Sequence, residues 1–423
     1  MQIYNNPKSE VWAELLSRPK IDNSGLENTV SNVLKDIQNN GDKAVFEYEE
    51  RFDHVKLSNL EVSKAEIDAA EHLIPTELKD AINTAKSNIY TFHAAQKHDL
   101  PKIETTNGVC CWQKDVAIEK VGLYIPGGTA PLFSTVLMLA VPAKIAGCKE
   151  IVLCTPPDKN GNVNAAILYA AKVSGVGKIF KIGGIQAIGA MAYGTESVPK
   201  VYKIFGPGNP YVTTAKQLVS LKDVAIDMPA GPSEVAIIAD ETAKAAVVAA
   251  DMLSQAEHGS TSQAIVFTTN ADLAVKIAEA ASKQCELSSR KEFISKSLEN
   301  SRIIILPEAE IIDAVNEYAP EHLIIMCKNY IKISEQIVNA GSVFLGYYTP
   351  ESAGDYASGT NHTLPTSGYA KAYSGVNLDS FIKKITFQEI SKEGLDNLGN
   401  TIKIMAEHEQ LTAHKYAVTV RQQ

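Results

Sequence analysis

Gln255 and His258 stand three residues apart, at the end of an apolar helical pattern that stops at Gly259. Side chains at this spacing share one face of a helix. An amide oxygen and an imidazole on one face can ligate a borderline divalent cation such as zinc or manganese. The same pair is also typical of an ordinary last helical turn, in which the helix dipole favours His258. The segment alone leaves both interpretations open.

Two further segments pair a carboxylate with an imidazole. Glu321 and His322 begin the apolar run HLIIM, at an expected strand end, where α/β proteins place ligands. Such a pair could supply a general base with a pKa near 6.5 and a carboxylate that activates water. Asp355 and His362 lie in the glycine-rich segment ESAGDYASGTNH, which suits a metal or an oriented substrate. In both cases the alternative is a polar loop in contact with solvent.

Signals for nucleotide binding are weaker. The dinucleotide pattern G-x-G-x-x-G is absent, because the segment GPGNPY lacks the third glycine, and no phosphate-binding loop of the G-x-x-x-x-G-K-[ST] type occurs. A nicotinamide nucleotide would therefore bind in a non-standard way. Glycine turns after three expected strands could line a nucleotide crevice or merely connect strands to helices: Gly127–Gly128, Gly183–Gly184 and Gly206–Gly208.

The elements that must position these residues alternate along the chain. Short apolar runs, separated by helical periodicity, predict strands at 121–126, 150–154, 178–182, 201–205, 234–240, 264–269, 302–306, 322–326 and 342–346. This alternation indicates parallel sheets in two tandem Rossmann-like α/β domains. We expect a helical region at 1–105, α/β domains at 106–230 and 231–375, and a helical tail at 376–423. The long loop from 347 to 375 is expected to be functional or disordered.

Composition excludes several classes of protein. The 423 residues include 40 Lys and Arg against 49 Asp and Glu, a net charge of −9 that disfavours binding to nucleic acid. Six cysteines without a C-x-x-C pair fit neither a disulfide scaffold nor a thiolate zinc site, and favour a reducing cytoplasm. The N-terminal sequence and the absence of long apolar stretches predict neither a signal peptide nor a membrane partner.

A set of longer motifs narrows the interpretation. In chain order they are VGLYIPGGTAPLFSTVLMLA, KIFGPGNPYVT, IDMPAGPSEV, LSQAEHG, PEHLII, GSVFLG, ESAGDYASGTNH and LTAHK. In this order and spacing the chain resembles the histidinol dehydrogenase family, from about residue 121 to the end and more loosely before it. The resemblance implies an aldehyde-dehydrogenase-like arrangement of the two α/β domains. It also implies a zinc-dependent homodimer that oxidises L-histidinol to L-histidine through histidinal and reduces two NAD⁺, in the last steps of histidine biosynthesis.

The resemblance also assigns roles to single residues. It implies one zinc ion per subunit, whose ligands also contact the substrate: Gln255, His258, Asp355 and His414. It implies His322 as general base and Glu321 as the group that activates water. The implied substrate contacts are His322, Ser233, His362 and Glu409, and the implied NAD⁺ contacts are Tyr124, Gln186 and Asn209. Because Glu409 and His414 lie on a terminal segment outside both α/β arrays, we expect the partner chain to supply them.

Two other functions are compatible with a two-domain α/β fold. A cysteine-dependent NAD aldehyde dehydrogenase of similar two-domain fold would use Cys148, Cys154 or Cys327, but none of these has a histidine nearby in sequence to activate it. An inactive binding protein of the same fold would have lost site positions, whereas all are present. We further expect His408 to be an exposed helix residue and 158–164 to be a surface loop without catalytic consequence.

Overall fold

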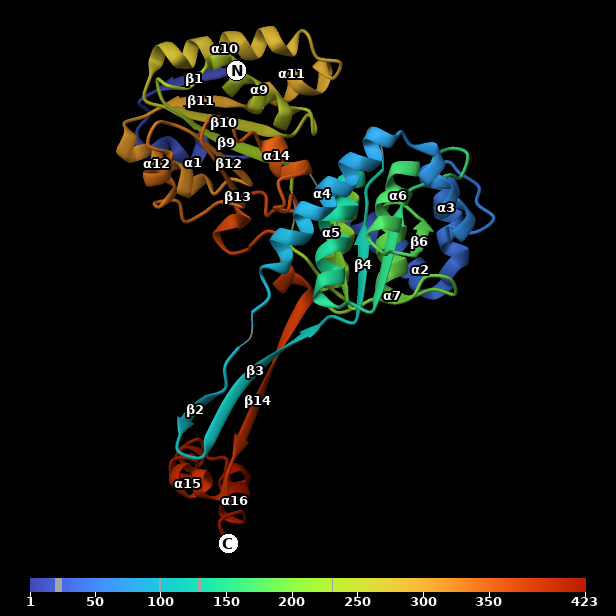
Figure 1. The fold of residues 1–423 in the computed structure, drawn as a ribbon, viewed down its shortest axis with the longest axis vertical. Coiled ribbons are helices and arrows are strands. Elements are labelled where there is room, and N and C mark those ends of the chain that lie inside the picture. The colour runs from blue at the N-terminus through green and yellow to red at the C-terminus, as the bar shows by residue number, and fades with distance from the viewer. Residues whose placement is uncertain (20–24, 99, 128–130, 230) are drawn as a thin grey trace.

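The chain folds into two α/β units that lie side by side and a long arm that projects away from them (Figure 1). The computed structural model describes residues 1–19, 25–98, 100–127, 131–229 and 231–423. Gly128, one of the expected turn glycines, lies outside the described residues. Within the described residues, no helix combines the length and the apolar character that crossing a bilayer requires.

The first unit is built on a five-stranded parallel sheet of order β6-β5-β4-β7-β8. Its strands are β4 (Lys120–Tyr124), β5 (Glu150–Thr155), β6 (Lys178–Lys181), β7 (Lys203–Phe205) and β8 (Ala225–Ile226). One face packs against α3 (Lys64–Leu73), α4 (Thr76–Ala94), α5 (Phe133–Ala146) and α6 (Ala165–Val173). The other face packs against α2 (Leu26–Tyr48), α7 (Gly184–Tyr193) and α8 (Pro210–Ser220). Burial on both faces explains why these strands read as apolar runs.

The second unit is built on a six-stranded parallel sheet of order β1-β11-β10-β9-β12-β13. Its strands are β1 (Gln2–Asn5), β9 (Glu234–Ala239), β10 (Gln263–Thr268), β11 (Arg302–Ile305), β12 (His322–Met326) and β13 (Ser342–Leu345). One face packs against α9 (Ala245–Ala256), α10 (Ala271–Cys285) and α11 (Lys291–Asn300). The other packs against α1 (Trp12–Leu15), α12 (Glu308–Tyr318) and α13 (Tyr330–Ser334). The predicted tandem α/β architecture and its parallel sheets are confirmed.

The N-terminal residues differ from the expected helical region. Gln2–Asn5 form β1, an edge strand that pairs in parallel with β11 of the second sheet. A single four-residue strand has no helical or alternating period long enough to detect. Its pairing partner lies 300 residues further along the chain, so local sequence could not predict it.

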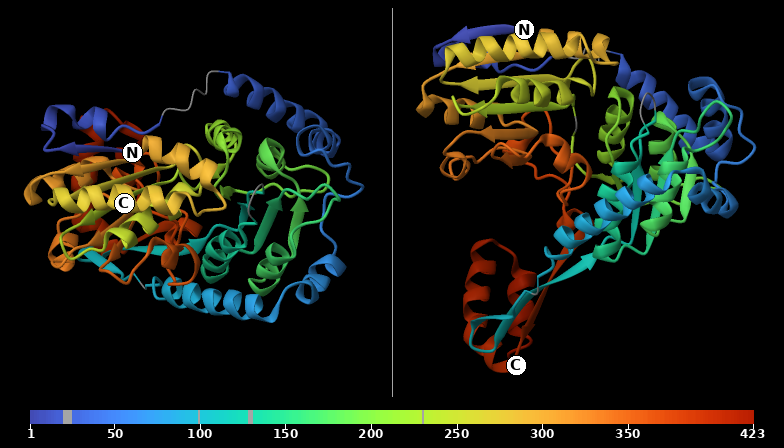
Figure 2. Two further views of the ribbon diagram at one scale, coloured as in Figure 1. Left: turned by 90° about the horizontal axis from the view of Figure 1, so that it is seen from above. Right: turned by 45° about the horizontal axis from the view of Figure 1, so that its top comes forward.

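The arm contains the expected C-terminal helices and adds a strand to them that was not predicted. It consists of β2 (Ile103–Thr106), β3 (Val109–Ala117) and β14 (Ile382–Ile390), which form an antiparallel sheet, with α15 (Lys392–His408) and α16 (Thr412–Thr419) at its far end (Figures 1 and 2). The apolar residues Ile382 and Ile385 are three apart, which resembles a helical spacing. Pairing with β3 along all nine residues makes the segment a strand instead. The hairpin β2–β3 spans the boundary expected at residue 105.

Short elements near the functional residues complete the fold. A π-helical turn, η2 (Glu49–Asp53), follows α2, and π-helical turns are frequent at functional sites. The loop expected between 347 and 375 contains α14 (Glu351–Tyr356) and the 3₁₀ turn η3 (Tyr369–Lys371), and η4 (Leu378–Phe381) precedes β14. A further 3₁₀ turn, η1 (Ser9–Val11), precedes α1.

Candidate active site

A buried cluster of imidazole and carboxylate groups forms where α9, β12 and α14 meet. His322, the first residue of β12, lies at its centre and is 4% exposed. Its Nδ1 is 3.7 Å from Oε2 of Glu321 and 3.8 Å from Oε1 of Glu351, and its Nε2 is 3.5 Å from Oδ1 of Asp355. These distances are too long for hydrogen bonds, and neither ring nitrogen has a hydrogen-bond partner among the described residues.

The donor atoms around His322 fit a metal ion. One ligand atom each from His258, Glu351 and Asp355 lies within 4.8 Å of the others. Gln255 is fully buried, and both of its amide atoms lack a hydrogen-bond partner among the residues described. A buried amide without partners is costly unless another group satisfies it. The oxygen and nitrogen donors together suit a borderline dication such as zinc.

The pKa values of the cluster also indicate a site for a cation. Burial raises the pKa of Glu321 and that of Glu351 to about 8. Burial alone would lower the pKa of His322, but the carboxylates of Glu351, Glu321 and Asp355 raise it to about 10. With these pKa values His322, Glu321 and Glu351 all hold protons near neutral pH, and a cation bound among them would favour the ionised carboxylates and the neutral imidazole that a general base requires.

The cluster lies at the amino ends of its strands. Ser233 directly precedes β9, and the backbone N–H of Glu234 donates to Oε2 of Glu321 at 3.0 Å. Open α/β sheets usually bind ligands at the carboxyl ends instead, as we expected for Glu321 and His322. The difference follows from the pairing of the two units, because the helix after β4, α5, reaches the cluster from the first unit. Asn361 Nδ2, in the loop before His362, donates to the backbone oxygen of Met138 on α5 at 2.6 Å.

His362 joins the two units directly. Its Nδ1 is 2.9 Å from the backbone oxygen of Asp355, which can only accept, so this nitrogen carries the hydrogen. Its Nε2 is 3.1 Å from Oγ1 of Thr135 on α5 and accepts the hydroxyl hydrogen. Burial lowers the pKa of His362, in keeping with this neutral form. The ring is therefore held in one orientation beside the cluster.

Two of the expected site residues lie elsewhere in the chain. Glu409, just after α15, and His414, on α16, are exposed on the far end of the arm, remote from the cluster (Figure 1). Of the nine residues expected at the metal and the substrate, the single chain brings six together, with Ser233 directly before β9, and leaves these two apart: the six are Gln255, His258, Glu321, His322, Asp355 and His362. His408 is exposed at the end of α15, as expected.

Glu351 was missed by the sequence analysis. It is 1% exposed, and neither of its carboxylate oxygens has a hydrogen-bond partner among the described residues. A signal was present, because Glu351 precedes Asp355 by four residues in ESAGD, and a helix places residues at that spacing on one face. The glycine-rich composition of the segment predicts a loop, in which this spacing would not place the two side chains on one face.

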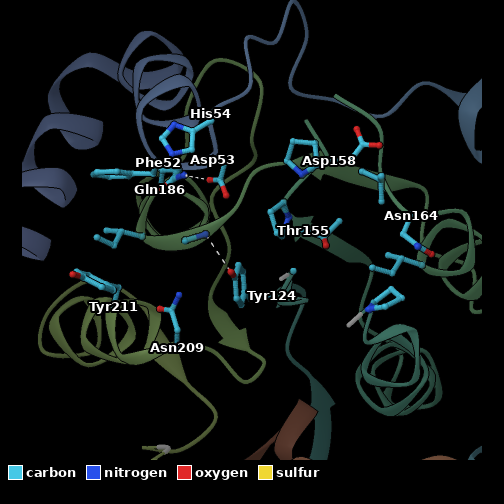
Figure 3. A pocket seen from close by; sticks show the side chains of 18 of the residues that line it. Phe52, Asp53, His54, Tyr124, Thr155, Asp158, Asn164, Gln186, Asn209 and Tyr211 are labelled. Atoms are coloured by element: carbon cyan, nitrogen blue, oxygen red, sulfur yellow. Dashed lines mark hydrogen bonds between the residues drawn. The ribbon is translucent and has the colours of Figure 1, made fainter. Parts of the chain in front are cut away.

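A cavity of about 850 Å³ opens at the carboxyl ends of the first sheet (Figure 3). The three residues expected to contact a nucleotide, Tyr124, Gln186 and Asn209, all line it. Tyr124 ends β4 and accepts through its hydroxyl from the N–H of Gly184 at 3.1 Å, and Asn209 caps α8. The loop 158–164 is at the surface, as expected, but it also lines this cavity.

Glu49 lies fully buried behind the cavity and supports a prediction on stability. Burial and the charge of Asp53 raise its pKa to about 8, from an ordinary value of 4.5. The folded protein thus keeps a proton that the unfolded chain releases between pH 4.5 and 8, so the free energy of unfolding falls as pH rises through this range. Glu49→Gln mimics the protonated acid. It should therefore remove this contribution to the fall in the free energy of unfolding.

Thermal unfolding at pH 5 and pH 8 checks this prediction. At each pH we compare the Tm of Glu49→Gln with that of wild type. We expect this difference to shift in favour of the variant by about 2 °C or more between pH 5 and pH 8. Glu50→Gln, on the same turn but exposed, serves as control and should follow wild type at both pH values. Equal differences at the two pH values for Glu49→Gln would contradict the assigned protonation.

The three thiols considered for nucleophilic catalysis lie in environments that keep them protonated. Burial raises the pKa of Cys148 to about 11 and that of Cys327 to about 12, and it raises the pKa of Cys154 as well. A reactive cysteine needs a pKa low enough for a thiolate to form. This environment disfavours the alternative of a cysteine-dependent aldehyde dehydrogenase.

Comparison with known proteins identifies the family. The profile of the family described as histidinol dehydrogenase matches residues 16–422. The chain belongs to the histidinol dehydrogenase family. A histidinol dehydrogenase of Bacteroides thetaiotaomicron is 63% identical over 422 residues, which cover 100% of this chain and 99% of that protein. One from Escherichia coli (strain K12) is 51% identical over 422 residues, covering 99% of this chain and 96% of that protein.

A solved structure extends the likeness to the fold. The crystal structure of histidinol dehydrogenase from Elizabethkingia anophelis matches with a TM-score of 0.98 and 55% sequence identity, covering 100% of this chain and 98% of that one. The family membership makes the chain an oxidoreductase of histidine biosynthesis, and the resemblance drawn from its motifs is confirmed.

Proposed function

We propose that the chain oxidises L-histidinol to L-histidine through histidinal, in two successive hydride transfers to NAD⁺ at a zinc-containing site. The observation that carries this proposal is the cluster around His322, which combines a base, a second acid and unsatisfied metal donors. The cavity of the first unit supports it, because its volume of about 850 Å³ is adequate for a dinucleotide. Pro131 lines this cavity and lies just before α5, whose Thr135 contacts His362.

Zinc would be held by Gln255, His258 and Asp355 of one chain and by His414 of the partner subunit. Glu351 lies among these groups and faces the same ion position. When bound, zinc would orient the imidazole and amine of the substrate and offset the carboxylate charge around His322. Ser233, His362 and Glu409 of the partner subunit would complete the contacts to the substrate.

The protein's own groups would handle the protons. In the first oxidation His322 would accept the hydroxyl proton of histidinol while the carbon gives up its hydride, which yields the aldehyde. In the second, Glu321 would take a proton from the water that attacks the aldehyde, and a second hydride leaves to give the carboxylate. Tyr124, Gln186 and Asn209 would hold NAD⁺, which would supply the acceptor for each hydride. Both steps would occur in one site, which keeps the aldehyde away from solvent.

A homodimer would complete the site. The arm exposes apolar side chains that a single chain leaves uncovered: Ile385, Phe387, Ile390, Ile404, Met405, Leu411, Tyr416 and Val420. Such a surface is typical of a subunit contact. If the arm of one subunit lies on the body of the other, His414 can reach the partner's cluster. We place the enzyme in the cytoplasm, where cysteines remain reduced.

The stoichiometry of the reaction tests the proposal. Purified protein with zinc, excess NAD⁺ and limiting L-histidinol should form two NADH for each histidinol consumed. Histidine should accumulate in the same amount as the histidinol lost. Formation of one NADH with accumulation of histidinal would instead indicate a simple alcohol dehydrogenase.

A further inference from the structure

Arg18, shortly after α1, forms an ion pair with Glu234, the first residue of β9. Its Nε lies 2.5 Å from Oε2 of Glu234 and its Nη2 lies 2.6 Å from Oε1. The side chain of Arg18 is 20% exposed and that of Glu234 is 2% exposed. A contact through two parallel hydrogen bonds fixes the orientation of both planar groups as well as their distance. Neither residue has a role in the reaction as proposed above.

The same guanidinium also binds the end of α12. Its Nη2 donates to the backbone oxygen of Tyr318 at 2.5 Å and to that of Ala319 at 3.4 Å, and its central carbon lies 4.2 Å from the centre of the Tyr318 ring. The last carbonyl groups of a helix have no partner within the helix, so the guanidinium satisfies them. Ala319 has a φ of 51° and turns the chain out of α12. Arg18 therefore holds the turn that leads into Glu321 and His322.

The backbone of Glu234 connects this ion pair to Glu321. Its N–H donates to Oε2 of Glu321 at 3.0 Å, and from the next residues onward β9 and β12 pair in parallel, with Val235 opposite His322. The same oxygen of Glu321 is 3.7 Å from Nδ1 of His322. A shift of the start of β9 relative to the start of β12 would therefore change the direction in which the Glu321 carboxylate points.

The surroundings keep the guanidinium in one place. Gly368 lies against it, because a Cβ atom at this residue would stand 3.2 Å from Nη1 of Arg18. Arg302, on β11, donates through Nη1 to the backbone oxygen of Ser17 at 3.3 Å, and so holds the residue next to Arg18. Arg302 thus binds the same N-terminal segment, but among the described residues it has no hydrogen bond to Glu321. It offers a matched control for Arg18.

We propose that Arg18 is a positioning residue for the second oxidation: by joining the start of β9 to the end of α12, it directs the Glu321 carboxylate towards the water that attacks the aldehyde. This inference rests on the proposed function, in which Glu321 activates that water. Arg18 acts only through Glu234 and through the backbone before Glu321. The first oxidation depends on it less, because the ring of His322 is also surrounded by two carboxylates of α14.

Separate kinetics of the two oxidations test the proposal. Arg18→Lys keeps the charge but loses the two parallel hydrogen bonds. We expect its kcat for oxidation of histidinal to fall about tenfold or more, since a misplacement of about 1 Å can cost a factor of about a hundred. The rate of the first NADH formed from histidinol in a single turnover, and the KM for histidinol, should stay within about twofold of wild type. Equal losses in both oxidations would contradict the proposal.

A second variant and a control accompany this measurement. Glu234→Gln weakens the ion pair from its other side while keeping the backbone N–H, so it should show the same selective loss. It also provides the comparison if Arg18→Lys does not fold. Arg302→Gln should leave both oxidations within about twofold of wild type. A selective loss in Arg302→Gln as large as that in Arg18→Lys would assign the effect to the N-terminal segment as a whole and overturn the proposal.

Thermal unfolding tests the link to Glu321 without the reaction. The Tm losses of Arg18→Lys and Glu321→Ala should not add, and the double variant should lose less than their sum by about 1 °C or more, because residues joined in one hydrogen-bond network are coupled. The losses of Arg302→Gln and Glu321→Ala should add. Additive losses for Arg18→Lys would overturn the proposal. Failure of wild type to oxidise histidinol would refute the proposed function instead, while the coupling in Tm would still be expected.

Discussion

Replacing His322 by Asn will lower kcat for histidinol oxidation by about a thousandfold or more, since general base catalysis typically contributes a factor of 10² to 10⁴. The reason is geometric. His322 is enclosed by the carboxylates of Glu321, Glu351 and Asp355, and its nitrogens have no hydrogen-bond partner among the described residues. Asparagine fits the same space but cannot accept a proton near neutral pH. Initial rates with saturating histidinol and NAD⁺ measure the effect.

Two further measurements separate loss of chemistry from loss of structure. Zinc content should be retained in His322→Asn, because His322 is not in the proposed ligand set, and Tm should show that the variant is folded. His408→Asn changes an exposed histidine of α15 and should behave as wild type. A folded, zinc-loaded His322→Asn with a kcat within tenfold of wild type would rule out His322 as the base.

Heterodimers that combine His414→Ala and His322→Ala will recover about half of the wild-type activity, although each homodimer is nearly inactive. The reason lies in the arm, which holds His414 far from the cluster of its own chain (Figure 1). If arms are exchanged, one of the two sites in the heterodimer has both residues intact, and the other lacks both. Co-expression with two different affinity tags and purification through both gives the heterodimer for rate measurements.

The matched control uses two residues of the same body. His258 and His322 both lie in the cluster of one chain, so a heterodimer of His258→Ala and His322→Ala has no intact site and should stay inactive. Recovery in this control would indicate contaminating wild-type protein. Absence of recovery with His414→Ala, in a heterodimer shown to be assembled, would mean that the sites are not shared.

Much of the fold was accessible from local sequence. Each apolar run that was predicted as a strand is one, because strands of a parallel sheet are buried on both faces and therefore read as continuous apolar segments. β1 and β14 were not predicted. β1 is too short to carry a period, and the three-residue spacing of Ile382 and Ile385 suggests a helix until β3 is there to pair with it. In both cases the decisive hydrogen bonds come from residues far away in the chain.

Some residues of the candidate site could likewise be identified from local sequence, and others could not. Side-chain type and the motifs identified Gln255, His258, Glu321, His322 and Asp355 as residues with related chemistry. Glu351 was not predicted, because a single carboxylate in an expected loop matches no motif and no helical or strand period.

The sequence by itself determined which elements form, which residues can do chemistry and to which family they point, since propensity, hydrophobic period and motif are properties of neighbouring residues. Only the tertiary structure decided how these residues meet. It joined the carboxyl ends of the first sheet to the amino ends of the second, surrounded His322 with carboxylates, and held His414 away on the arm. These outcomes depend on packing between segments hundreds of residues apart, and no local pattern encodes the distance or charge that results.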